Sequence, residues 1–106
     1  MLNGTKSILM RASGPGLAYA LPAYFTPADV LPDPKQDLFK GSVVTDSNDD
    51  WDSALKPYFD AVGAFGWEDG SKDSALRVPL STGSYTIQAT GHGGSGTVLI
   101  EFYESP

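Results

Sequence analysis

Residues 74–103 read SALRVPLSTGSYTIQATGHGGSGTVLIEFY, which contains three segments of β-strand character separated by two turn-forming segments. The middle segment alternates Tyr, Ile and Ala with Thr, Gln and Thr, which is the period of a strand with one buried face. Both separators contain glycine, which adopts the positive φ angles of tight turns at little cost. We therefore expect antiparallel strands at Ser74 to Leu80, Ser84 to Thr90 and Thr97 to Tyr103.

The last of these expected strands has two faces of different composition. One face is wholly apolar and holds Val98, Ile100 and Phe102. The other face carries Leu99 and Tyr103 on either side of a glutamate, so it is half apolar. We expect this second face to pack against another element of the fold or against another chain.

Earlier parts of the chain predict shorter strands around a proline-rich excursion. Lys6 to Ala12 alternates in the manner of a half-buried strand, and Gln36 to Lys40 and Ser42 to Thr45 predict two more strands. Between them, Leu17 to Pro34 carries four prolines, which lack the N–H group that a ladder needs. We expect an ordered loop there, which we call the proline-rich excursion, without regular β-sheet hydrogen bonds.

Apolar residues recur at helical spacing after the acidic run that ends at Asp50. The stripe consists of Trp51, Leu55, Tyr58, Phe59 and Val62. Asp50 is the expected N-cap, and Pro57 limits the helix to one or two turns. The whole pattern predicts an all-β fold, a β-sandwich or jelly-roll-like arrangement with one short helix in the connecting region. Residues 1–106 are expected to form one domain, because the length suits a single hydrophobic core.

Charge and composition exclude several classes of function. The net charge of −6 argues against nucleic acid as a partner, since nucleic-acid binding requires a basic surface. The absence of cysteine excludes disulfide scaffolds, thiolate zinc sites and cysteine nucleophiles. No apolar segment near the start is long enough to span a bilayer, so membrane insertion is not expected.

The acidity is local, because residues 46–73 contain eight acids and two lysines and so account for the whole net charge. Within this segment, oxygen-bearing side chains alternate at Asp46, Asn48, Asp50 and Asp52. Calcium prefers several such oxygen ligands, although the EF-hand pattern is broken by Trp51 and Pro57 at its glycine and glutamate positions. The four residues are therefore a candidate calcium site, and an Asx-rich turn is the structural alternative.

Nucleophilic catalysis finds little support in the sequence. His92 is the sole histidine and stands among glycines, which is a poor setting for a base that must be held in place. The glycines at 91, 93 and 96 satisfy a dinucleotide-binding spacing, but they join two expected strands and lead into no helix. We expect a protein that is not an enzyme.

Aromatic side chains offer a candidate carbohydrate surface. Trp51 and Trp67, with Tyr58 and Tyr24, could form a platform on which sugar rings stack. The alternative interpretation is that these rings close the core of a small sandwich. A polysaccharide is therefore a candidate ligand, bound by Trp51 and Trp67.

Several motifs occur together in a characteristic order. They are Lys6-Ser-Ile-Leu-Met-Arg-Ala-Ser-Gly-Pro-Gly-Leu-Ala18, Leu31-Pro-Asp-Pro34, Asn48-Asp-Asp-Trp51, Gly70-Ser-Lys-Asp-Ser-Ala-Leu76, Gly83-Ser-Tyr-Thr86 and Gly93-Gly-Ser-Gly-Thr-Val-Leu-Ile-Glu-Phe-Tyr103. In this order the chain resembles a β-rich repeat module of large secreted and surface proteins of Verrucomicrobia and related bacteria. Its second half resembles, more loosely, the bacterial pre-peptidase C-terminal domain.

These resemblances imply an extracellular or cell-surface module without catalytic residues, used for attachment, spacing or targeting. They also imply a further strand before the Lys6 strand, and the given sequence begins almost at Lys6. Two interpretations follow: the sandwich lacks that strand, or the sequence is a piece of a longer protein. A sandwich without that strand would expose an edge and an apolar groove. We expect assembly through strand exchange or terminal docking, into a filament in one form, with Ile8, Met10, Leu99 and Tyr103 as the candidate assembly residues.

The expected function is thus a non-catalytic structural or assembly module that contacts its own copies or neighbouring modules. The alternative is a targeting module that binds carbohydrate or calcium. Calcium is the one cofactor for which the sequence offers candidate ligands.

Overall fold

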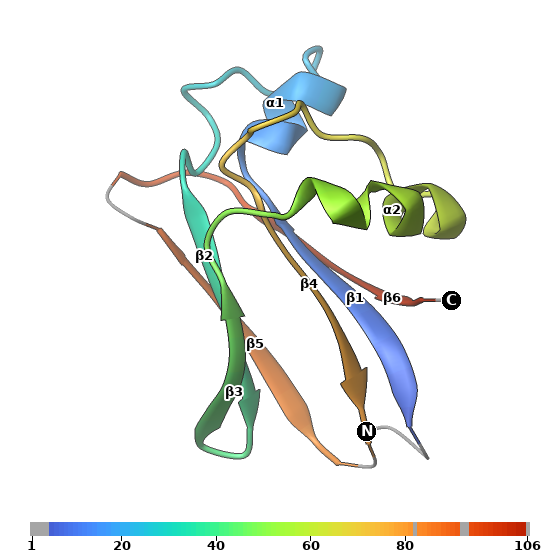
Figure 1. Cartoon of the computed structure of the whole chain (residues 1–106). Coiled ribbons are helices and arrows are strands. Elements are labelled where there is room, and N and C mark those ends of the chain that lie inside the picture. Colours follow the sequence, from blue (N-terminus) through green and yellow to red (C-terminus); the bar gives the residue numbers. More distant parts are fainter. Residues whose placement is uncertain (1–4, 82, 92–93, 106) are drawn as a thin grey trace.

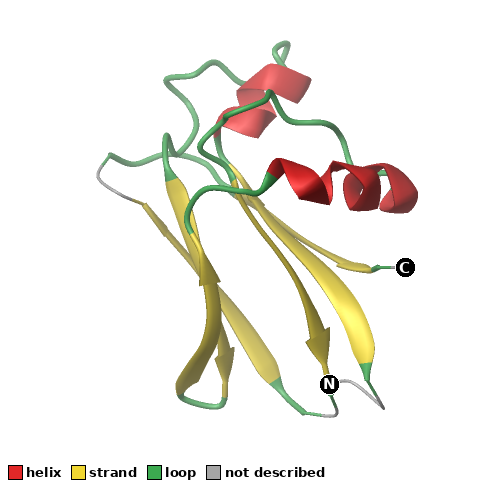
Figure 2. Cartoon of the chain, in the orientation of Figure 1, coloured by secondary structure: helices red, strands yellow, loops and turns green. Residues whose placement is uncertain are grey.

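The computed structural model describes residues 5–81, 83–91 and 94–105, and it contains two three-stranded antiparallel sheets packed face to face (Figures 1 and 2). The first sheet consists of β1 (Lys6–Ser13), β4 (Ser74–Leu80) and β6 (Leu99–Glu104), in the order β4-β1-β6. The second consists of β2 (Pro34–Lys40), β3 (Val43–Asn48) and β5 (Tyr85–Gly91), in the order β3-β2-β5. The expected mainly-β sandwich is confirmed.

One helix, α2 (Lys56–Val62), lies over the first sheet on the side away from the second, and another, α1 (Pro15–Ala20), lies at the end of the sandwich where β1 ends (Figure 1). The connecting region contains η1 (Ser53–Leu55), a 3₁₀ turn, which continues into α2. Pro57 stands in the first turn of α2, where its missing N–H costs nothing. The expected N-cap at Asp50 is wrong, because the Asp52 carboxylate accepts the Ala54 N–H at 2.9 Å and caps η1.

A second short helix, α1 (Pro15–Ala20), was not expected from the sequence. Its first residue is a proline between two glycines, a pattern that also fits a turn. The rest of the excursion is ordered, since Thr97 donates its N–H to the Asp29 carbonyl and accepts the Leu31 N–H, both at 2.9 Å. These bonds hold residue 97 out of β6, which therefore starts two residues later than predicted.

The central strand β1 is buried on both faces, so the expectation of a half-buried strand is wrong. Ile8 and Met10 lie between the sheets and pack with Leu38 of β2. Leu9 lies on the opposite face with Trp51 and other aromatic residues of the helical layer. That layer comes from residues far from β1 in the sequence, and it covers the face that alternation alone predicts to be exposed.

The two sheets are joined by hydrogen bonds along one side of the sandwich. The Ser74 hydroxyl of β4 donates to the carbonyl of Asn48 of β3 at 2.8 Å, and the Ala75 N–H donates to the Asn48 side-chain oxygen at 3.1 Å. Given the two strand orders, β5 and β6 are the edge strands of the opposite side. No helix in the described part of the chain is both long and apolar enough to cross a membrane.

Candidate functional site: an open side between β5 and β6

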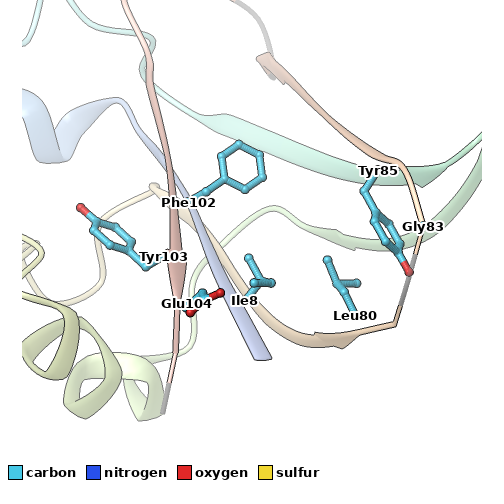
Figure 3. Close-up of a pocket in the computed structure, with 7 residues that line it drawn as sticks. All are labelled: Ile8, Leu80, Gly83, Tyr85, Phe102, Tyr103 and Glu104. Carbon is cyan, nitrogen blue, oxygen red and sulfur yellow. The ribbon is translucent and has the colours of Figure 1, made fainter. Parts of the chain in front are cut away.

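A cavity of about 280 Å³ opens between the edge strands β5 and β6 (Figure 3). Phe102 points into it from β6, and Tyr85 approaches from β5. Its walls also include Ile8, Leu80, Gly83, Tyr103 and Glu104. The lining is mainly apolar, and we call this region, from β5 across the cavity to β6, the open side.

Phe102 is exposed because the second sheet does not extend over β6. In the antiparallel register, Phe102 stands opposite Met10 and Ile100 stands opposite Ala12. Directly paired residues point to the same face, so Phe102 and Ile100 face the second sheet as Met10 does. Yet Met10 is fully buried, whereas Phe102 is 58% exposed and Ile100 is 37% exposed. The apolar face of β6 thus lacks the cover that the neighbouring strand has.

Within the described residues, the backbone of β6 also has groups at this edge that no neighbouring strand pairs with. Ser105 donates its N–H to the carbonyl of Ser7 at 2.8 Å, which makes these two residues a hydrogen-bonded pair of the β1–β6 ladder. Such pairs alternate with pairs whose N–H and C=O groups point away from the neighbouring strand. The outward-pointing groups therefore belong to Ile100, Phe102 and Glu104, and they form the free edge of the first sheet.

The described edge strands of the open side lack three of the devices that block strand addition, namely proline, lysine and a bulge. We call the opposite side, where hydrogen bonds join β3 and β4, the closed side. There β4 contains Pro79, and the pairing of β3 with β2 is interrupted by a register shift beside Leu38. Proline and bulges are common devices that block edge pairing. Within the described residues, β5 and β6 contain neither proline nor lysine, and their ladders run without a shift.

Acidic residues of β6 are neutralised by neighbours in the same sheet. Glu104 forms an ion pair of 2.7 Å with Lys6, and Glu101 lies 3.8 Å from Arg11. The β5 strand has no charged residue. The open side is therefore nearly neutral, although the chain as a whole carries −6.

Arg11 anchors β6 and the helical layer to β1. Its fully buried guanidinium lies 4.2 Å from the centre of the Trp67 ring and 4.5 Å from that of Phe59, in cation–π geometry. It also donates to the Phe65 carbonyl at 2.9 Å. Burial lowers the pKa of Arg11 below its usual value, and the charge of Glu101 opposes that shift.

Tyr103 extends this cluster along the helix-facing side of β6. Its hydroxyl donates a hydrogen bond to Glu101. Desolvation raises the pKa of Tyr103, and the hydrogen bond and negative charge of Glu101 raise it further. Tyr103 thus secures β6 from one face while Phe102 is exposed on the other.

A second buried network holds the helical layer in place. The Asp73 carboxylate is fully buried and accepts the N–H groups of Gly14 and Gly16 at 2.7 and 2.9 Å and the Ser71 hydroxyl at 2.6 Å. A Cβ on Gly16 would overlap the Trp67 indole. The two glycines and the aspartate of separate sequence motifs are therefore parts of one structural joint.

Both tryptophans of the candidate sugar site are buried in the core. Trp51 is 8% exposed and Trp67 is 5% exposed, and their ring centres lie 5.3 Å apart. Their indole N–H groups donate to the hydroxyls of Ser71 and Ser13 at 3.1 and 3.0 Å. Neither ring offers a face to a sugar, so both tryptophans are core residues, as the alternative interpretation of the sequence expected.

Of the four candidate calcium ligands, the acidic group that the structure brings together contains one. That group is Asp33, Asp49 and Asp50, whose carboxylates lie within 4.8 Å of one another. Asp50 is the one member of this group that the sequence predicted as a ligand. The other predicted ligands include Asp52, which caps η1, and Asn48, whose side-chain oxygen is bonded to Ala75. Sequence spacing missed Asp33, which reaches the group from the proline-rich excursion.

The four candidate assembly residues have different environments. Ile8 and Tyr103 line the open side, and Leu99 is 40% exposed at the start of β6. Met10 is fully buried between the sheets and offers no surface to another chain. Sequence reasoning missed Phe102, whose signal is the wholly apolar face of its strand. His92 lies outside the described residues.

No protein-family model, curated protein or solved structure matches this chain significantly. The structure itself defines the class, a two-layer antiparallel β-sandwich with a helical layer over one sheet. The resemblance to bacterial surface modules stays a prediction of the sequence.

Proposed function

We propose that this chain is a non-catalytic structural module of an extracellular bacterial surface protein, and that it associates with other chains through the open side. The observation that carries the proposal is Phe102. Its ring is 58% exposed, it lies on the core-facing side of its strand, and its backbone groups lie on a free edge. Strand addition at such an edge would pair the backbone and bury the ring in one step.

Main-chain hydrogen bonding and the burial of apolar surface both favour a protein partner at the open side. A strand placed beside β6 would receive main-chain hydrogen bonds from Ile100, Phe102 and Glu104. Its side chains would cover the cavity between the sheets, where Ile8 and Leu80 form the floor. Burial of the exposed apolar surface supplies the driving force, at roughly 25 cal/mol per Å² removed from water.

Sedimentation velocity across a wide range of concentrations tests this proposal. The wild type is expected to form species larger than the monomer, and Phe102→Lys is expected to remain monomeric because its ammonium group would be buried on association. Val43→Lys is the matched control, because Val43 is 63% exposed on the edge strand β3 of the closed side. A wild type that stays monomeric at every concentration overturns the proposal.

The alternative of polysaccharide targeting requires aromatic residues other than the two tryptophans. Tyr24 is 80% exposed and Tyr19 is 55% exposed, and both belong to the segment around α1. If the chain binds an insoluble polysaccharide, Tyr24→Ala should reduce its retention. Equal retention of this variant would remove that surface from consideration.

A further inference from the structure

We infer that the partner at the open side is a second copy of this chain, with β6 of one copy paired antiparallel to β6 of the other. This inference rests on the proposed function and specifies both the partner and the contact. The two first sheets would join into one sheet with the strand order β4-β1-β6-β6-β1-β4. The twofold axis would run perpendicular to that sheet, so the faces of both copies would stay aligned.

The register follows from the faces and charges of β6. Aligned faces require that each residue stands opposite one that points to the same face. The axis must therefore pass midway between one residue of β6 and the same residue of the second copy, which we describe as an axis through that residue. An axis through Glu101 would place two carboxylates opposite each other, which is unfavourable. An axis through Phe102 pairs the same number of residues of the six-residue strand and avoids this repulsion.

With the axis at Phe102, the facing side chains are chemically compatible. The two Phe102 rings stand opposite each other over the cavities, where each is exposed in the single chain. Glu101 stands opposite Tyr103 of the second copy, a carboxylate beside a hydroxyl. Ile100 stands opposite Glu104 of the second copy, whose charge is already paired with Lys6. The outward backbone groups of residues 100, 102 and 104 all find partners.

Charge favours a second copy over a partner of strong charge. A basic partner would be drawn to the acidic segment 46–73, but the open side carries paired charges on β6 and none on β5. The surface that best matches a neutral, apolar strand edge is another edge of the same kind. A copy of β6 supplies such an edge.

The contact is isologous and therefore closes on itself. A twofold contact uses the same surface on both subunits and leaves no free copy of it, so this contact yields a closed pair. A filament would need a second contact elsewhere on the chain. Negative-stain images of the purified chain should accordingly show small particles without filaments.

Cysteine cross-linking tests the register, since the chain has no native cysteine. The double variant Ile100→Cys/Glu104→Cys keeps the Phe102 ring and should convert to a disulfide-linked dimer under mild oxidation, because residue 100 of one copy pairs with residue 104 of the other, with Cα atoms about 5.5 Å apart, within disulfide range. Ile100→Cys is the matched control on the same face of β6. Its Cα atoms would be four residues out of register, about 13 Å apart, so no specific dimer should form.

The outcomes separate this inference from the proposed function. If the wild type forms larger species but the double variant Ile100→Cys/Glu104→Cys does not cross-link, or Ile100→Cys alone cross-links equally, the β6 pairing is overturned and the assembly function stands. If the wild type is monomeric at every concentration, both are overturned. The mass of the wild-type particle gives a reading that needs no variant: a dimer supports the closed pair, and an open series of larger species contradicts it.

Discussion

The Asp73 carboxylate accepts the backbone N–H of Gly16 at 2.9 Å, which links two residues 57 positions apart in the chain. Gly16 lies in the first turn of α1, and Asp73 directly precedes β4. The same carboxylate accepts the Gly14 N–H, so it satisfies two buried backbone donors. This joint fixes the helical layer over the first sheet.

Replacement of Asp73 by alanine should destabilise the fold by about 2–4 kcal/mol, because it leaves two backbone N–H groups and the Ser71 hydroxyl without their acceptor. Urea denaturation would measure the change in the free energy of unfolding. Asp60→Ala is the control, since this aspartate is exposed on α2. Equal stability of the two variants would show that the joint is not needed.

Substitution of Gly16 by alanine should cost about 1–3 kcal/mol of stability, because the new methyl group would overlap the buried Trp67 indole. Gly66→Ala is a matched control, because a Cβ there would have no neighbour within 4 Å and Gly66 does not require a positive φ. Thermal denaturation of both variants measures the difference. Similar melting temperatures would contradict the close approach of α1 and the indole.

The stability of the protein should decrease as the pH rises above about 10, because the folded state raises the pKa of Tyr103 above its ordinary value of 10.0. The unfolded chain then loses the phenolic proton first, so it binds fewer protons than the folded state. This contribution is fully present below pH 10 and is lost as the pH passes the pKa of the folded state. Tyr103→Phe should have a flatter pH dependence than the wild type.

Urea unfolding of Tyr103→Phe at about pH 9 and about pH 11 would measure this slope. The exposed Tyr24 supplies the control, because Tyr24→Phe should retain the wild-type slope. An unchanged slope in Tyr103→Phe would mean that the Glu101 hydrogen bond does not affect the titration.

Calcium, if bound, should raise the melting temperature, because a ligand that binds only the folded state stabilises it. We expect EDTA to lower the melting temperature of the wild type, and we expect Asp33→Asn to remove that sensitivity because Asp33 belongs to the three-carboxylate group. Asp46→Asn should retain it, since Asp46 lies outside that group. Loss of the response in Asp46→Asn alone would instead favour the alternating set predicted from the sequence.

The strands could be predicted because their signal is local. The alternation at Tyr85, Ile87 and Ala89 describes one buried face, and β5 has that face toward the core. The helix α1 escaped prediction because Gly14-Pro15-Gly16 also fits a turn, and its helical form depends on Asp73 far along the chain. The burial of both faces of β1 escaped for the same reason, since the aromatic layer arrives from other segments.

The candidate site could be predicted only in outline. The sequence indicated an exposed edge and an apolar groove, and it placed Ile8 and Tyr103 there. The exposure of Phe102 depends on where the second sheet ends relative to β6, which no local pattern records. Trp51 and Trp67 could not be assigned from the sequence, because tryptophan suits both a sugar-binding surface and a hydrophobic core. The hydrogen bonds of the two buried indoles place them in the core.

The most direct test of the open side as an assembly surface is amide hydrogen exchange of the wild-type protein at low and high concentration. The amides of Ile100, Phe102 and Glu104 point to the free edge and should exchange rapidly in the dilute monomer. We predict that the same three amides become protected at high concentration, while those of the edge strand β3 are unaffected. Rapid exchange of all three at every concentration would contradict the account.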